Sequence, residues 1–430
     1  MSNSTPCSST DTTYRSEAKQ HFSATSRQIP DRLRRAGVWC AWAACFCIPL
    51  STSLLGLFSG LATLCWLLSG SFRQVPAACK RHPALLFALL LFALLAIGLG
   101  YSAAEPADAL DALKKYRELL LLPVMVSLLS MHRLAGQRAE QFFVAGCLTL
   151  MLISWAMALN LVPSERYGNS LLFHITHSFF MAVLAYWALI YAVNRQSRRL
   201  LWIAVFLAAT ANLFYIAPGR TGMFVYLCLM LLFIMQRLSR WKRLSAIALL
   251  VIALIGFYCT SANFSQRIEL VAQEIAAYQP GQARSSIGQR FDWWMASLHL
   301  IAERPLLGHG TGSFLAAQQQ QKWGSDMQPS NNPHNEYLFL AVQVGIPGLA
   351  LFLAILLCQW REGLRLPPEK KNLMQGVLTA LYAGSLMNSL MFDSHQGHFY
   401  LFMSAALMAT GVEPPVPTDA VEKDSMAGPH

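Results

Sequence analysis

The chain has 430 residues, of which 55% are hydrophobic and only 13% are charged. An ordinary soluble domain carries about 25% charged residues, so this composition cannot cover a large water-facing surface. It excludes a large soluble domain, a disordered chain, a coiled coil and a disulfide scaffold, and it predicts an all-α integral membrane protein. The net charge of +11 does not predict a nucleic-acid partner, because the basic residues lie in short clusters between apolar runs.

Twelve apolar runs follow a polar N-terminal segment, and each predicts a membrane-spanning helix, since a span needs about 20 mostly apolar residues. The first two runs are continuous, but Pro49 and Ser51 break them near the middle. The runs lie near 37–51, 53–71, 83–101, 116–130, 140–161, 171–193, 200–217, 221–236, 244–260, 335–358, 372–391 and 399–412. Residues 1–36 are polar and Ser/Thr-rich, and we expect them to form a disordered cytoplasmic tail.

The basic residues of alternate loops set the orientation. Five short loops hold sixteen Lys and Arg residues: Arg73, Lys80, Arg81; Arg133, Arg138; Arg195, Arg198, Arg199; Arg237, Arg240, Lys242, Arg243; Arg361, Arg365, Lys370 and Lys371. The positive-inside rule therefore places both termini in the cytoplasm. We expect spans one to nine over 37–260, an external loop over 261–333, spans ten to twelve over 334–412, and a cytoplasmic tail over 413–430.

The external loop, periplasmic in a Gram-negative cell, also carries helical patterns. Apolar residues recur at helical spacing from Phe264 to Tyr278 and again from Ile287 to Ile301. Two amphipathic helices are expected to lie against the membrane face or to cap the bundle.

A first candidate site residue is Arg220, in the turn 217–222 that opens the eighth span. A helix N-terminus favours an anion through its free N–H groups and its dipole. A guanidinium at that position forms bidentate hydrogen bonds to phosphate. The alternative is that Arg220 only anchors the helix at the membrane interface.

A second candidate is Arg290, four residues before Trp294 on the second amphipathic helix. The pair predicts either an anion-binding cation or a structural arginine–tryptophan stack. The glycine-rich stretch 308–312 is not a nucleotide-binding loop, because no strand precedes it.

A third candidate is His334, near the start of the tenth span. Asn332 is expected to cap that helix and Pro333 to occupy its first position, which puts His334 in the first turn. The helix dipole there disfavours the imidazolium form, so His334 should be neutral at pH 7 and available as a base. A purely structural histidine is the alternative.

Further polar residues share the expected external side, and packing or orientation explains each of them. They are Lys115, Tyr116 and Arg117, then His174 and His177, and finally Asp393, His395 and His398. The external segments hold no DxD or HExxH pattern and no clustered carboxylates and histidines, so a divalent metal is not implied.

At these places the sequence resembles the O-antigen ligase/polymerase superfamily of bacterial membrane glycosyltransferases. The resemblance rests on the motifs PGRTG (218–222), QRFDWW…ERPLLGHGTGSF (289–314) and PHNEYLFLAVQVGIPGLALFL (333–353), with a weaker match at KYRELLLLP (115–123). With the layout of spans and loop, it covers residues 37–412.

The resemblance implies transfer of a glycan from undecaprenyl pyrophosphate to an acceptor, with no metal or other cofactor, at the periplasmic side of the bacterial inner membrane. It favours an O-antigen ligase, whose acceptor is lipid A–core in lipopolysaccharide biosynthesis. An O-antigen polymerase and an O-oligosaccharyltransferase remain alternatives. The implied roles are a general base for His334 and donor-pyrophosphate binding for Arg220 and Arg290. The possible supporting residues are Lys115, Tyr116, Arg117, Asn335, Tyr337 and Asp393.

A transporter or flippase for lipid-linked glycans is the alternative from a different class, with the same arginines binding a lipid phosphate in transit. Transporters usually carry broken helices and charges at the membrane midplane. Here the polar residues lie at the expected external helix ends, which favours chemistry at the membrane surface.

Overall fold

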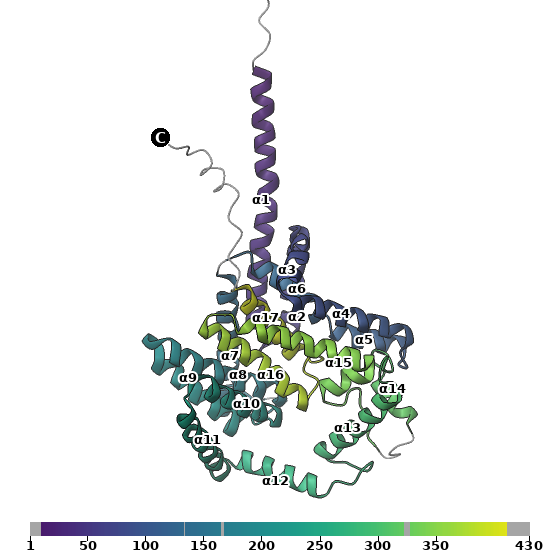
Figure 1. The fold of residues 1–430 in the computed structure, drawn as a ribbon. Coiled ribbons are helices and arrows are strands. Elements are labelled where there is room, and N and C mark those ends of the chain that lie inside the picture. Colours follow the sequence, from purple (N-terminus) through teal and green to yellow (C-terminus); the bar gives the residue numbers. More distant parts are fainter. Residues whose placement is uncertain (1–9, 133, 165–166, 322–326, 411–430) are drawn as a thin grey trace, which may run out of the picture.

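The structure is a computed structural model that describes residues 10–132, 134–164, 167–321 and 327–410, with side chains from Ile29 onward. Every regular element within these residues is helical, as the composition predicts (Figure 1). The expected C-terminal tail, 413–430, lies outside the described residues.

Each of the twelve apolar runs lies in a helix. These helices are α1 (Thr10–Cys47), α2 (Thr52–Leu68), α4 (Pro83–Gly98), α6 (Glu118–Leu129), α7 (Ala135–Ala158), α8 (His174–Asn194), α9 (Arg199–Ala211), α10 (Arg220–Arg237), α11 (Arg240–Thr260), α15 (Glu336–Gly363), α16 (Pro368–Met387) and α17 (Ser394–Ala409). Seven helical segments in the described part of the chain are long and apolar enough to cross a membrane, namely those built on α4, α7, α8, α9, α10, α11 and α15. The twelve-span count therefore stays a prediction.

The N-terminal region differs from the sequence expectation. Helix α1 begins at Thr10, so residues 10–36, expected to be a disordered tail, are helical here. The break within the first apolar run is where Pro49 and Ser51 predicted it, because α1 ends at Cys47 and α2 begins at Thr52. The Ser51 hydroxyl caps α2 by accepting a hydrogen bond from the Leu54 N–H.

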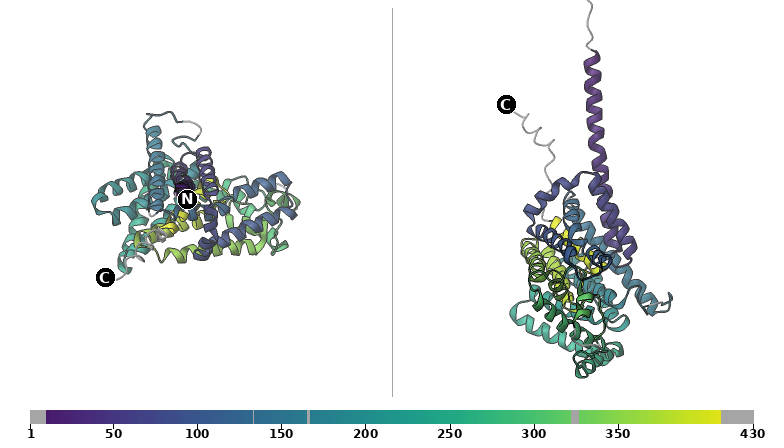
Figure 2. Two further views of the ribbon diagram at one scale, coloured as in Figure 1. Left: turned by 90° about the horizontal axis from the view of Figure 1, so that it is seen from above. Right: turned by 90° about the vertical axis from the view of Figure 1, so that its right-hand side faces the viewer.

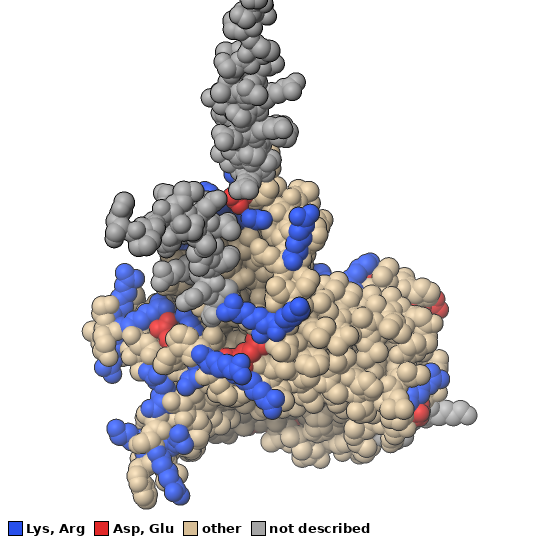
Figure 3. Space-filling model, turned by 45° about the horizontal axis from the view of Figure 1, so that its top comes forward, with Lys and Arg blue, Asp and Glu red and all other residues tan. Residues whose placement is uncertain are grey.

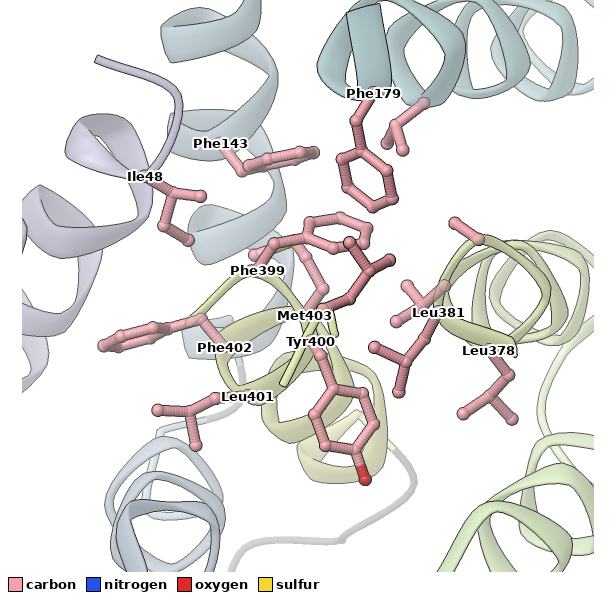
Figure 4. Close-up of a cluster of buried hydrophobic side chains, with 14 of the residues drawn as sticks. Ile48, Phe143, Phe179, Leu378, Leu381, Phe399, Tyr400, Leu401, Phe402 and Met403 are labelled. Atoms are coloured by element: carbon pink, nitrogen blue, oxygen red, sulfur yellow. The ribbon is translucent and has the colours of Figure 1, made fainter. Parts of the chain in front are cut away.

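The core lies around α17, which packs against α6, α7 and α16 (Figure 4). Phe399 is its centre, with ring centroids 5.2 Å from Phe143 on α7 and 5.5 Å from Phe179 on α8. Such tilted and edge-to-face aromatic pairs contribute about 0.5–1.5 kcal/mol each beyond their buried area. The last helix of the chain is therefore fixed at the middle of the bundle.

The segment between α11 and α15 carries three helices: α12 (Ala262–Ala276), α13 (Ser286–Glu303) and α14 (Phe314–Gln320). They follow the edge of the bundle from α11 toward α15 (Figure 1). Helices α12 and α13 coincide with the two amphipathic patterns read from the sequence. Helix α11 itself has no buried residue, and it contacts the bundle through Phe257, which stacks on Phe214.

Helix α15 is broken at Val344 and Gly345, where Gly345 adopts a positive φ of 71°. The backbone of the segment 305–312 replaces the hydrogen bonds that the break removes. Ile346 N–H donates to the Pro305 carbonyl, Gly310 N–H donates to Gln343 O, and His309 N–H donates to Val342 O. The glycine-rich stretch therefore holds the two halves of α15 together through backbone hydrogen bonds.

Helix directions define two ends of the molecule. The N-termini of α8, α10, α15 and α17 meet at one end, together with α12 and α13. The opposite end includes the C-terminus of α15, where Glu362 contacts His82 at the start of α4. Lys and Arg side chains gather around this opposite end, from which α1 also projects (Figures 2 and 3). This distribution agrees with the charge pattern used to orient the chain.

Candidate active site

Arg220 is the first residue of α10, at the helix N-terminus that the sequence predicted. The glycines on either side of it bring α10 against α8. A Cβ atom at Gly219 or Gly222 would overlap Ser178 of α8, so no larger residue fits at either position without movement of the helices. The motif 218–222 therefore works through close helix packing, which fixes the place from which the Arg220 side chain extends.

The Arg220 guanidinium is paired with a carboxylate that the sequence analysis did not select. Its Nη1 and Nη2 donate to Glu274 Oε2 and Oε1 of α12, over 3.3 and 3.2 Å. Glu274 Oε2 also accepts the Ile287 N–H at the start of α13, over 2.9 Å. One carboxylate thus joins three elements, and Arg220 is already engaged before any anion binds.

Arg290 on α13 has no hydrogen bond or ion pair within the described residues, although it is half-buried. Its pKa is lowered by desolvation and by the nearby positive charge of Arg220, while Glu274 raises it. His174, at the start of α8, interacts electrostatically with Arg220, Arg267 and Arg290. Three arginines with a single neutralising carboxylate thus form a positive region, called here the arginine cluster (Arg220, Arg267, Arg290).

His334 is not in the first turn of α15, which corrects the sequence expectation. Helix α15 begins at Glu336, and its N-cap is Asn335, whose side chain accepts a hydrogen bond from the Leu338 N–H. His334 precedes the cap in a left-handed conformation, with φ of 51°. Asn332 accepts the His334 N–H in a local turn instead of capping the helix. A strained backbone of this kind is common at functional sites.

Two side chains linked by hydrogen bonds, Asn388 and Asp393, hold the His334 ring in place. Its Nδ1 lies 2.7 Å from Asn388 Oδ1, and Asn388 Nδ2 donates to Asp393 Oδ2, also over 2.7 Å. The donation to Asp393 fixes the amide so that its oxygen faces the ring, and His334 must then donate through Nδ1–H. The lone pair of a neutral His334 is therefore on Nε2, the tautomer that a general base requires.

The surroundings of His334 and Asp393 shift the pKa values of both side chains. Desolvation lowers the pKa of His334, Arg290 lowers it further, and the hydrogen bond with Asn388 raises it. The neutral state expected from the sequence is thus reached through burial and a nearby cation. Burial raises the pKa of Asp393 to about 6, against the opposing effects of Lys115 and Asn388.

The two tryptophans of α13 fix the segment that carries His334. Trp293 Nε1–H donates to Gln328 O, and its ring centroid is 5.3 Å from that of His334. Trp294 Nε1–H donates to Pro333 O over 3.0 Å and packs against Phe291. The expected stack of Arg290 on Trp294 is replaced by this anchoring, which leaves the arginine available.

Most of the residues expected to support the site have structural contacts. The Tyr116 hydroxyl donates to the buried Glu336, and the Tyr337 hydroxyl donates to Tyr382 O. Asn335 caps α15, and Arg117 donates to the Ser394 hydroxyl. These contacts link the start of α6 to α15, α16 and α17.

Among the expected supporting residues, Lys115 lies beside the hydrogen-bonded group of His334, Asn388 and Asp393, and its charge acts on Asp393. Its Nζ lies 4.0 Å from the ring centroid of Phe392, next to Asp393. Beside it a cavity of about 450 Å³ opens between α5 (Pro106–Lys115) and α14, with Asn331 and Asp108 among its lining residues.

The other histidines of this end have packing roles. His177 Nε2 contacts Asn212 Oδ1, His395 Nδ1 contacts Ile48 O, and His398 Nδ1 contacts both Ser394 O and Glu118. The described residues contain no group of three or more His, Cys, Asp or Glu side chains that could hold a metal ion.

The sequence analysis missed Glu274, Arg267 and Asn388. Each lies far along the chain from the residue it contacts, with 54 positions between Asn388 and His334 and also between Glu274 and Arg220. No local spacing predicts such pairs.

The comparisons with known proteins agree with this arrangement. Residues 205–353 match a family model described as O-antigen ligase, and this range contains Arg220, Arg290 and His334. An uncharacterised protein of Haemophilus influenzae (strain ATCC 51907 / DSM 11121 / KW20 / Rd) is 28% identical over 164 residues, which cover 36% of this chain and 41% of the relative. The match thus spans about two fifths of that relative's length. The family match thus covers the part of the chain that carries the three motifs on which the resemblance to the O-antigen ligase superfamily rests.

Proposed function

We propose that this protein is an O-antigen ligase of the bacterial inner membrane. In this proposal it transfers O-antigen polysaccharide from undecaprenyl pyrophosphate to a sugar hydroxyl of lipid A–core. The family supports a glycosyltransferase that uses a lipid-linked glycan. The observation that carries the mechanism is the oriented His334, with its Nε2 lone pair available, beside the unpartnered Arg290.

The proposed reaction is a single displacement. His334 Nε2 takes the proton of the acceptor hydroxyl while that oxygen attacks the anomeric carbon of the donor sugar. The bond between the anomeric carbon and the phosphate oxygen breaks, and its electron pair leaves with the lipid pyrophosphate. Direct attack inverts the anomeric centre. Asn388 and Asp393 act as positioning residues, because they fix the tautomer and the orientation of the ring.

The arginine cluster would stabilise the charge that develops on the leaving group. Arg290 is available to a phosphate oxygen without breaking any contact seen in the described residues. Arg220 would share its guanidinium between Glu274 and the pyrophosphate, since its Nε is buried without a partner. Fixed cations in a partly dehydrated site stabilise such charge more strongly than they would in water.

The proposal also includes the topology. We propose twelve spans, with both termini in the cytoplasm and with α12, α13 and α14 on the periplasmic side. The cavity beside Lys115 lies near Asp393 and offers carboxylate and amide groups that suit sugar hydroxyls, so we assign the acceptor sugar to it.

Reconstitution in detergent tests the function. The purified chain is incubated with lipid-linked glycan and, in separate arms, with lipid A–core, a second lipid-linked repeat, or a Ser/Thr-containing peptide. We expect product only with lipid A–core and none from His334→Gln, which keeps hydrogen bonding but is not a base at neutral pH.

Other outcomes would point to other functions. Product only with the second repeat would identify a polymerase, and product only with the peptide an oligosaccharyltransferase. Binding without product in every arm would favour a transporter. Wild-type transfer by a correctly folded His334→Gln would remove the general base.

A further inference from the structure

A second cavity lies at the end of the molecule opposite the arginine cluster. Its volume is about 660 Å³, and it is enclosed by α1, by α3 (Val75–Arg81) and by the C-terminal end of α6. None of its lining residues belongs to the candidate active site. We call it the basic cavity.

The charges of the basic cavity are mainly positive. Its lining includes Arg34, Arg35 and Arg81, together with His82 and His132. Asp31 is the one carboxylate among the lining residues, and it is paired with Arg34 over 3.0 Å. Arg35 lies beside this ion pair, and its positive charge favours an anion in the cavity.

Two nitrogens in the wall of the cavity lack partners. Arg34 Nε and His82 Nε2 are buried, and neither has a hydrogen bond within the described part of the chain. His82 is otherwise held, because its Nδ1 contacts Glu362 Oε2 over 2.9 Å. Buried polar groups are nearly always hydrogen-bonded, so the unpaired Arg34 Nε–H indicates that this wall is complete only when an acceptor is present.

The remaining walls and the surroundings indicate a lipid. Val126, Met131 and Ala78 supply apolar surface inside the cavity. Just outside it, Trp39 lies one turn beyond Arg35 on α1, and Phe72 precedes α3; both side chains are exposed. A tryptophan and a phenylalanine beside arginines are typical of the interface between headgroups and acyl chains.

We propose that the basic cavity binds the phosphate headgroup of an anionic phospholipid, with the acyl chains along the apolar flank near Trp39 and Phe72. Basic pockets between helices at the end rich in Lys and Arg are suited to such headgroups. The bound lipid would join α1 and α3 to α6, which leads directly to the Tyr116 region of the candidate site. The inference stands independently of the proposed glycan transfer.

Native mass spectrometry of the full chain in detergent tests the site, with phosphatidylglycerol, phosphatidylcholine and inorganic phosphate as separate probes. We expect one tightly held phosphatidylglycerol, at least about tenfold preferred over phosphatidylcholine. Inorganic phosphate, which lacks acyl chains, should not bind at comparable concentration. Equal binding of phosphatidylglycerol and phosphatidylcholine would overturn the proposal. Equal binding of inorganic phosphate would also overturn it, because it would show an anion site with no lipid specificity.

Matched variants locate the site. Arg35→Gln with Arg81→Gln removes two charges from the cavity and should weaken phosphatidylglycerol binding by about 25-fold, at about fivefold for each arginine. Arg32→Gln with Arg73→Gln removes the same charge from neighbouring positions that do not line the cavity, and should change binding less than about twofold. Equal losses in both pairs would assign the binding to overall charge. The wild-type lipid preference decides the matter even if the first pair folds poorly.

Discussion

Asn388→Leu is the most direct test of how the structure prepares His334. Leucine has the same branching and the same number of side-chain heavy atoms as asparagine but offers no acceptor to the His334 Nδ1–H, which now lies 2.7 Å from the amide oxygen. The ring would then be free to carry its proton on Nε2, where the proposed lone pair must be. Asn388 is buried, so water cannot easily replace the lost acceptor.

The size of the effect follows from that geometry. A hydrogen bond of this type contributes about 0.5–1.5 kcal/mol, and leaving its donor unsatisfied costs about 1–3 kcal/mol. At about 1.4 kcal/mol for each factor of ten, the rate of transfer should fall about 10- to 100-fold. Binding of the donor should change little, because Asn388 is not part of the arginine cluster.

The assay is the initial rate of glycan transfer by the reconstituted protein as a function of pH. The wild-type rate should fall on acidification only below the usual range of histidine, because the pKa of His334 is lowered. Asn388→Leu removes a contact that raises this pKa, so the acidic limb should move to still lower pH. Ser389→Ala, whose hydroxyl contacts Asn332 and not the ring, is the matched control and should stay within about twofold of wild type. Normal transfer by Asn388→Leu, or an equal loss in the control, would refute the positioning role.

Three further predictions concern the neighbouring charges. Arg290→Lys should lower the transfer rate about 10²–10³-fold, since a lysine lacks the planar fork, and an unchanged rate would exclude Arg290 from donor binding. Glu274→Gln should lower Tm, because it breaks the contact that joins α10 to α12, while transfer persists; inactivity at full stability would contradict this. Asp393→Asn should raise Tm relative to wild type above pH 6. The folded-state pKa of Asp393 is raised to about 6, so the wild-type carboxylate loses stability as pH rises from 4 to 6, by at most about 3 kcal/mol. The Tm difference should vanish below pH 4, and a constant difference would refute this.

The positions of the helices could be read from the sequence because hydropathy is a local property. All twelve apolar runs are helical, and the patterns starting at Phe264 and Ile287 became α12 and α13. The extension of α1 to Thr10 was missed because its N-terminal half is polar. The count of spans could not be tested in the same way, because helices as short as α6 do not meet the length of a span by themselves.

The sequence predicted several residues of the candidate site, but it did not predict the contacts that these residues make. Arg220 begins a helix as expected, whereas His334 lies outside α15 because Asn335 caps it. The pairing of Arg220 with Glu274 depends on how α12 returns to α10, which no motif encodes. The contact between Asn388 and His334 could not be predicted either, because it depends on the packing of α16 against α15.

The broken helix α15 has a consequence for evolution and for protein engineering. Its two halves are joined by backbone hydrogen bonds from residues 305–312, so the break and the loop complete each other. A chimera that exchanges the whole loop between relatives would have to transplant α15 with it, because otherwise carbonyls such as that of the buried Gln343 lose their donors inside the helix bundle. The loop is therefore not an exchangeable specificity module. Before Pro305, the positions of α12 and α13 other than Glu274, Arg290, Trp293 and Trp294 are free to diverge with the glycan, and substrate specificity should accordingly vary there.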